Sequence, residues 1–207
     1  MKVCQKIICL SVFCALMTHQ AYGQVDEPVD RNFPGPTIGL NLNFGQAQKA
    51  GGSSSPGAYW NVAGELGYVV KRDTWKRIEL GLELGTGGLE FRDKNQFGSS
   101  NVDIDLKSYA MFKAGYGYSL GGQAFGVWRL GAGMAFADAE AGSGLLRGSD
   151  EGSAITALLG WDAVFPASDV LHLIFGFNFR YFNFKWDNFD SFQVNVPAIY
   201  ASARLQL

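Results

Sequence analysis

Charged side chains recur at alternate positions within otherwise apolar stretches of this sequence. In an extended chain such residues share one face, because successive side chains of a β-strand point to opposite sides. Ten charged residues fall within such alternating stretches: Glu65, Glu79, Glu83, Asp105, Lys107, Lys113, Arg129, Asp162, Arg180 and Arg204. Five carboxylates against five cations indicate a paired ion network or a polar conduit, because a buried charge requires a partner.

Conventional catalytic groups are sparse in this chain. His172 is the only histidine after residue 23, and the nearest serine, Ser168, falls in an expected turn. A nucleophile and its base must lie within hydrogen-bond reach of each other, which this placement does not favour. A single histidine, with no cysteine after Cys14, also cannot form a His/Cys metal cluster. We therefore predict no catalytic residue, no cofactor site and no metal site.

The first 23 residues have the pattern of a secretory signal peptide: two lysines, a short apolar run, and small residues at positions 21 and 23. All three cysteines lie inside this segment, which excludes a disulfide-stapled mature domain. Residues 24–35 are polar and are expected to form a flexible periplasmic leader. The chain after residue 23 carries 15 Lys and Arg against 19 Asp and Glu, a net charge of −4, which argues against a nucleic-acid-binding protein.

From residue 36 onward, apolar residues alternate with polar residues or glycine, which is typical of β-strands. We expect eight strands, over residues 36–46, 60–70, 78–85, 104–118, 127–136, 155–165, 171–186 and 197–207. Long connections rich in Gly, Ser and Asp are expected at 47–58, 86–101, 138–153 and 185–192, and short ones at 71–76, 120–123 and 166–169. Short turns at every second connection indicate antiparallel neighbours, with all long loops at one end.

The composition of the two strand faces indicates which one points outward. A soluble lipocalin-like barrel and a transmembrane barrel both have eight antiparallel strands, but they turn opposite faces outward. Here the polar face is crowded with glycine and carries balanced charges, which suits a narrow lumen filled by side chains. The apolar face has aromatic residues toward the strand ends, as in the girdles of membrane barrels. With the export signal, these features predict an all-β, eight-stranded antiparallel up-and-down barrel in the bacterial outer membrane.

Eight amphipathic strands, short turns, long loops and a charged lumen resemble the small outer-membrane barrels of the OmpA/OmpX kind, over residues 36–207. The resemblance implies contact with outer-membrane lipid and lipopolysaccharide, insertion by the barrel-assembly machinery, and a monomeric state. Such barrels usually end in Phe, which the assembly machinery reads. This chain departs from the pattern because it ends in Leu207.

The stretch 171–186 contains seven aromatic residues around Arg180. Its alternation places Arg180 in the lumen, at the level of Asp105 or another inward carboxylate. Phe182 and Phe184 fall on the same side near the long-loop end. Either these rings cap the lumen, or a bulge changes the register there.

Three functions are compatible with these patterns. The favoured one is a structural or surface-interaction role through four long extracellular loops, with the lumen plugged by its charge network, because eight strands leave an interior that side chains can fill. The first alternative is a narrow passive channel for ions or small solutes. The second is a lipid-modifying enzyme, which is less compatible with a His172 that faces the lumen.

Overall fold

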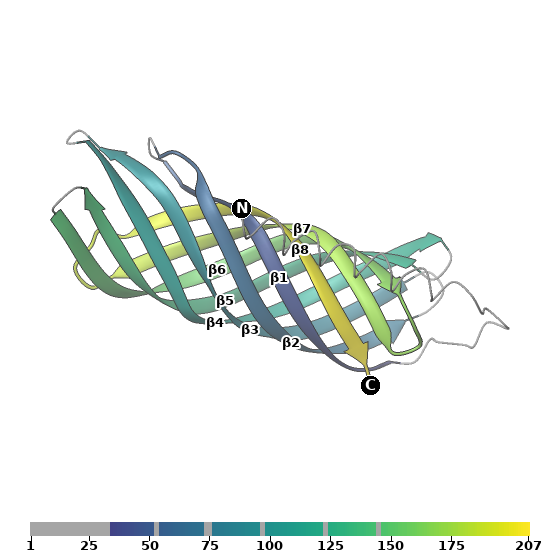
Figure 1. The fold of residues 1–207 in the computed structure, drawn as a ribbon. Coiled ribbons are helices and arrows are strands. Elements are labelled where there is room, and N and C mark those ends of the chain that lie inside the picture. The colour runs from purple at the N-terminus through teal and green to yellow at the C-terminus, as the bar shows by residue number, and fades with distance from the viewer. Residues whose placement is uncertain (1–33, 52–53, 73–75, 96–97, 122–123, 144–145) are drawn as a thin grey trace.

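Eight antiparallel strands close into a barrel in sequence order, as Figure 1 shows. The computed structural model describes residues 34–51, 54–72, 76–95, 98–121, 124–143 and 146–207. The strands are β1 (Gly35–Lys49), β2 (Gly57–Arg72), β3 (Lys76–Asn95), β4 (Gly98–Gly121), β5 (Ala124–Ser143), β6 (Leu146–Pro166), β7 (Leu171–Trp186) and β8 (Phe192–Gln206). The predicted eight-stranded up-and-down barrel is confirmed. The predicted signal peptide and most of the predicted leader lie outside the described residues.

The outward surface carries a broad apolar band. Leu40, Leu66, Phe112 and Ile199, which lie on four different strands, are each more than half exposed. The rings expected in the aromatic girdles also lie on this face: Trp60, Tyr68, Tyr116, Tyr118, Trp128, Phe136 and Phe165 are exposed, and Trp161 and Tyr181 are partly exposed. This apolar outer surface is the one expected of a barrel that faces lipid. Within the described part of the chain, no helix is long and apolar enough to cross a membrane.

The strands differ in length. β1, β2, β7 and β8 have 15 or 16 residues, whereas β3, β4, β5 and β6 have 20 to 24. A tilted strand needs only about 9–11 residues to cross a bilayer. The long strands therefore extend well beyond the apolar band, at the end of the barrel opposite to the C-terminus (Figure 1).

Two of the four long loops expected from the sequence are instead strand. The ranges 86–101 and 138–153 lie almost wholly within the paired hairpins β3–β4 and β5–β6, in which only 96–97 and 144–145 are outside the strands. Their Gly, Ser and Asp content suggested loops. However, Leu89, Phe91 and Val102 alternate with polar residues there and are buried, so burial of apolar side chains favours strands over loop.

A single extra residue in β4 reverses the faces of that strand. Leu106 pairs with Ala137 of β5, but Ser108 pairs with the next residue, Phe136. The pairing with β3 shifts at the same place. This is a β-bulge, which inserts one residue and so exchanges the two faces beyond it.

The bulge divides the barrel into two zones. We call the part beyond it the outer zone (87–95, 98–106, 137–143, 146–153 and 182–196) and the remainder the membrane zone. In β4, Lys113, Met111 and Tyr109 are buried before the bulge, and Leu106 and Ile104 are buried after it. Odd-numbered residues of β4 therefore point inward before the bulge, and even-numbered residues point inward beyond it. The change occurs where the strand leaves the apolar band.

Candidate functional site

The lumen of the membrane zone contains a network of buried charges. Eight of the ten charged residues singled out in the sequence lie there, none more than 4 % exposed: Glu65, Glu79, Glu83, Lys113, Arg129, Asp162, Arg180 and Arg204. They come from β2 through β8. Alternation along each strand turns these side chains inward, and glycine on neighbouring strands leaves room for them. A Cβ added to Gly81, for example, would lie only 3.4 Å from Glu65 Oε1.

Glu83 of β3 accepts hydrogen bonds from four residues. Its carboxylate accepts hydrogen bonds from Lys113 Nζ and Arg180 Nη2, both at 2.8 Å. It also accepts from Asn41 Nδ2 and Tyr109 Oη, both at 2.7 Å. Four donors from four residues satisfy this carboxylate, which is 1 % exposed.

The remaining carboxylates extend the network toward the end of the barrel at which the C-terminus lies. Glu65 pairs with Lys113 and accepts from Arg204 Nη2 at 2.6 Å. Glu79 accepts from Arg204 Nη1 and Arg129 Nη2, both at 2.7 Å, and Arg129 also pairs with Asp162. The ion pairs therefore form one continuous chain: Arg180, Glu83, Lys113, Glu65, Arg204, Glu79, Arg129 and Asp162. Each buried charge in this chain is stabilised by its neighbours, because a buried charge without a partner is energetically costly.

Arg77 is a member of this network that the sequence analysis missed. It is fully buried and pairs with Glu79, and its guanidinium lies 5.9 Å from the centre of the Phe125 ring. With Arg77, the ion network of the membrane zone holds five cations and four carboxylates, not five of each. Arg77 lies two positions before Glu79 and hence on the same face, so alternation extended by one step would have found it.

Asp105 and Lys107 are not in the lumen, so the prediction was wrong for these two residues. The bulge in β4 turns them outward, where Lys107 is 54 % exposed and pairs with Asp138 at 2.8 Å and with Asp105 at 3.5 Å. Consequently Asp105 is not the partner of Arg180. The inward carboxylate at the level of Arg180 is Glu83.

Apolar side chains fill the lumen on both sides of the charges. In the outer zone, Phe182, Phe184 and Trp186 of β7 form a stack with ring-centre distances of 5.7 and 5.1 Å. β7 pairs with both neighbours without a register shift up to Phe184, which removes the bulge alternative and leaves the capping one. Toward the end of the barrel at which the C-terminus lies, a second cluster of buried apolar side chains is formed by Phe125, Val127, Val164 and Ile174.

The predicted lumen position of His172 agrees with the structure. The side chain lies on β7 and is 1 % exposed, inside the barrel and away from the lipid-facing surface. Ser168 is exposed in the β6–β7 turn, where its Oγ accepts a hydrogen bond from the backbone N–H of Leu171 at 3.0 Å. Among the described residues, no three His, Cys, Asp or Glu side chains gather as a metal site would require.

A second polar site, also missed from the sequence, lies in the outer zone. Asp150 of β6 is 5 % exposed and accepts hydrogen bonds from the backbone N–H groups of Asn188 at 2.7 Å and Phe189 at 2.6 Å. It also accepts from Asn188 Nδ2 at 2.9 Å. Burial acts to raise the pKa of Asp150, but these hydrogen bonds to its charged form outweigh burial and hold the pKa below its usual value. Asp150 thus fastens the β7–β8 turn to β6.

Comparisons with known proteins agree with this architecture. Residues 7–198 match the family model of the outer membrane protein beta-barrel domain. No curated protein matches the chain. Among solved structures, Neisserial surface protein A is similar with 12 % identity and a TM-score of 0.52, over 84 % of this chain and 99 % of that one. A major outer membrane protein from Thermus thermophilus is similar with 12 % identity and a TM-score of 0.46, over 81 % of this chain and 99 % of that one.

The family match covers most of the chain, and the fold is the one that the family requires. The exposed apolar band, the polar lumen and the closed sheet each fit a barrel that faces lipid. This chain therefore belongs to the outer membrane protein beta-barrel domain family and is a small, eight-stranded barrel of the bacterial outer membrane.

Proposed function

We propose that this protein is a closed barrel that conducts no ions and that serves as a structural and surface-interaction protein. The observation that supports the closed state best is the filling of the lumen at three successive levels. The aromatic stack of β7 lies in the outer zone, the ion network in the middle, and the cluster around Phe125 toward the periplasmic turns. Eight-stranded barrels have interiors that side chains can fill, and this lumen follows that rule.

Single-channel recording in planar lipid bilayers tests the closed state. The purified, folded protein should produce no conductance steps under conditions in which a general porin, used as a positive control, gives clear ones. Regular steps from the wild-type protein would overturn this proposal. They would instead favour the narrow channel, the alternative suggested by the continuous chain of charges.

We propose that the outer zone is extracellular and forms the interaction surface. Its outward face is rich in carboxylates, with Glu90, Asp103, Asp105, Asp138, Glu140 and Glu151 on four adjacent strands. Cross-strand pairing sets Asp103 opposite Glu140 and Asp138 opposite Glu151. Such a surface attracts partners that carry a basic patch, and it does so less strongly as the salt concentration rises.

Binding of whole cells to surfaces of defined charge tests this role. Cells that display the protein should adhere to a polylysine-coated surface more than cells that lack it. The combined variant Asp103→Asn with Glu140→Gln should reduce the difference. Gln48→Asn, a change on the short-strand side that alters no charge, serves as the control. Equal adhesion of wild type and the charge variant would argue against an electrostatic partner.

We also propose the membrane partners implied by the OmpA/OmpX resemblance: lipopolysaccharide around a monomeric barrel, and insertion by the barrel-assembly machinery. The terminal strand β8 is intact and ends beside Leu207, which is exposed. If the machinery reads a terminal aromatic residue, Leu207→Phe should increase the fraction of folded barrel in isolated membranes, and Leu207→Ser should not. Equal folded fractions in all three would exclude a role for this residue.

No catalytic step is part of this proposal. Lipid hydrolysis would need a nucleophile and a base on the lipid-facing surface, whereas His172 is enclosed by the barrel wall. Release of acyl chains from lipopolysaccharide by the purified protein would contradict this view if His172→Ala abolished it.

A further inference from the structure

An apolar groove crosses the lipid-facing surface of β5, β6, β7, β8 and β1, and its volume is about 710 Å³. Six exposed apolar side chains line it: Phe44, Trp128, Leu159, Phe177, Phe179 and Ile199. Neighbouring strands lie about 4.8 Å apart, so the four spacings between these strands give the groove a length of roughly 19 Å. One leaflet of the hydrocarbon core is roughly 15 Å thick. The groove is therefore long enough to hold one tilted acyl chain of a membrane lipid.

The groove rises along the barrel toward the outer zone. Trp128, at one end of the groove, is four residues from the start of β5 at Ala124. Gln46, at the other end, is eleven residues from the start of β1 at Gly35. Both strands start at the same end of the barrel, because all neighbouring strands are antiparallel. A lipid whose head group lies beside the outer zone can therefore extend a chain down the groove.

Pro197 interrupts the hydrogen-bond ladder between β1 and β8 at the outer end of the groove. The backbone N–H of Ala50 donates to the carbonyl of Gln193 at 2.8 Å, so even-numbered residues of β1 occupy the hydrogen-bonded pairs with β8. Gln46 belongs to this series and lies opposite Pro197, which has no N–H to donate. The pair is accordingly missing from the ladder, although the register is the same on both sides of it. The backbone carbonyl of Gln46 therefore has no donor on β8.

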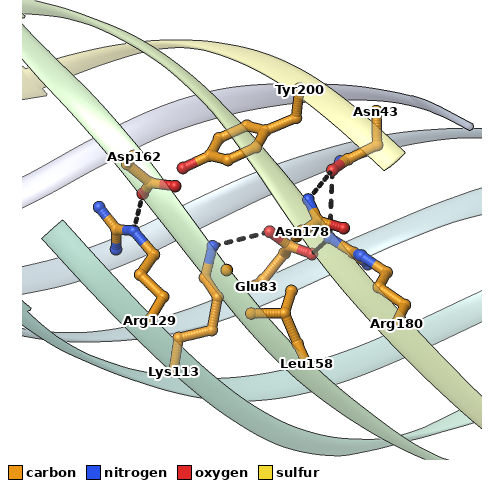
Figure 2. Close-up of a pocket in the computed structure, with 10 residues that line it drawn as sticks. Asn43, Glu83, Lys113, Arg129, Leu158, Asp162, Asn178, Arg180 and Tyr200 are labelled. Atoms are coloured by element: carbon orange, nitrogen blue, oxygen red, sulfur yellow. Dashed lines mark hydrogen bonds and ion pairs between the residues drawn. The ribbon is translucent and has the colours of Figure 1, made fainter. Parts of the chain in front are cut away.

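The barrel wall behind the groove is closed. Asn178 of β7 lines both the groove and a cavity of only about 10 Å³ within the ion network. Figure 2 shows the side chain of Asn178 in the lumen, close to Asn43 and Arg180. Its Nδ2 donates to Asn43 Oδ1 at 3.0 Å, and Arg180 donates to Glu83 at 2.8 Å. A bound chain therefore lies against the outer surface and does not enter the lumen.

We propose that this groove binds one acyl chain of lipopolysaccharide, and that the Gln46 carbonyl accepts a hydrogen bond from the head of that chain. Acyl chains of lipopolysaccharide are attached through amides as well as esters and carry hydroxyl groups, so they offer donors there. Phospholipid chains are attached through esters, which only accept. An unpaired backbone carbonyl beside the hydrocarbon region is costly, so a lipid with a donor is favoured. The inference rests on the proposed contact with lipopolysaccharide and names its site.

Binding of lipid A, the anchor of lipopolysaccharide, to the delipidated barrel in detergent tests the groove by native mass spectrometry. We expect one lipid A per barrel to bind more tightly than phosphatidylglycerol. Ile199→Trp, which fills the groove, should weaken this binding about tenfold, the effect of displacing roughly two methylene groups. Leu66→Trp, at an exposed position outside the groove, should not. Heat-modifiable gel migration verifies that both variants fold. Equal binding by both variants and the wild type would overturn the proposal.

Pro197→Ala tests the choice of lipid. This variant restores an N–H opposite the Gln46 carbonyl and leaves the apolar groove open. Its affinity for lipid A should fall roughly fivefold, the loss of one hydrogen bond, while its affinity for phosphatidylglycerol stays the same. Equal affinities of the wild type for the two lipids would exclude lipopolysaccharide as the specific occupant. Binding in detergent does not depend on which end of the barrel is extracellular, so it can succeed or fail separately from the proposed surface role.

Discussion

The membrane zone and the outer zone of this barrel have opposite polarity, although the same strands run through both. In the membrane zone, apolar side chains such as Leu66 are outside and charged ones such as Glu83 are inside. In the outer zone, Asp103 and its acidic neighbours are outside, and Phe184 and other apolar side chains are inside. One residue of β4, inserted between Leu106 and Ser108, allows that strand to satisfy both arrangements.

This reversal follows from the medium that surrounds each zone. Where water surrounds the barrel, burial of apolar side chains stabilises the interior. Where lipid surrounds it, an apolar interior gains little, because lipid tails are themselves apolar. Paired charges that cannot enter lipid then hold the interior in a specific arrangement. The two zones should therefore respond differently to substitution, pH and salt.

The largest effect is expected at Glu83. In Glu83→Ala, Arg180 loses the only carboxylate that it pairs with among the described residues, and Lys113 loses one of two. Removal of one partner from a buried pair costs roughly 3–5 kcal/mol. The free energy of unfolding in lipid vesicles, measured by urea titration with heat-modifiable gel migration, should fall by that amount. Glu90→Ala, at an exposed position of the same strand, should leave it unchanged. Equal loss in both variants would contradict the buried network.

A smaller and more local effect is expected at Phe184. This ring is fully buried and stacks on Phe182 and Trp186. Phe184→Ala should cost about 3 kcal/mol, the lower end for loss of a buried aromatic ring, because the surroundings can relax toward water. The outer zone should become sensitive to protease on intact cells while the membrane zone remains folded. Loss of the whole barrel would show that the two zones unfold as one.

Glu83 and Phe184 also show how much of the structure could be predicted from the sequence. Alternation alone revealed the eight strands and placed both side chains in the lumen, because period-two burial is a local property. Alternation placed Asp105 and Lys107 on the wrong face. A bulge depends on pairing with β3 and β5, so it cannot be recognised from the residues of β4 alone. Alternation also missed Asp150, whose partners Asn188 and Phe189 are distant in sequence.

An acid-dependent effect is expected at Asp150. Because its folded-state pKa lies below the unfolded value, its hydrogen bonds stabilise the β7–β8 turn fully above the unfolded pKa of about 3.9. That stabilisation is lost as the pH falls through the folded-state pKa. Cleavage of the 187–191 turn by pepsin should therefore increase steeply only in strong acid. In Asp150→Asn, which cannot ionise, cleavage should not show this dependence. A wild-type cleavage profile that matches that of Asp150→Asn would exclude the role.

The smallest effect is expected at Lys107. Its pairs with Asp138 and Asp105 lie on the exposed outer face, where solvent and salt screen ion pairs. Lys107→Ala should leave the urea midpoint of unfolding unchanged at both low and high salt. A clear loss of stability that disappears in high salt would show that the outer ion pairs matter as much as the inner ones.

Reactivity of paired cysteine variants tests the reversal of polarity most directly. The chain has no cysteine after Cys14, so single cysteines can be introduced at positions 104 and 105 on opposite faces of β4. On intact cells, a membrane-impermeant maleimide should label Asp105→Cys rapidly and leave Ile104→Cys unlabelled until the barrel is unfolded. Rapid labelling of Ile104→Cys with protection of Asp105→Cys would show that β4 alternates without a bulge, and it would contradict the account of the two zones.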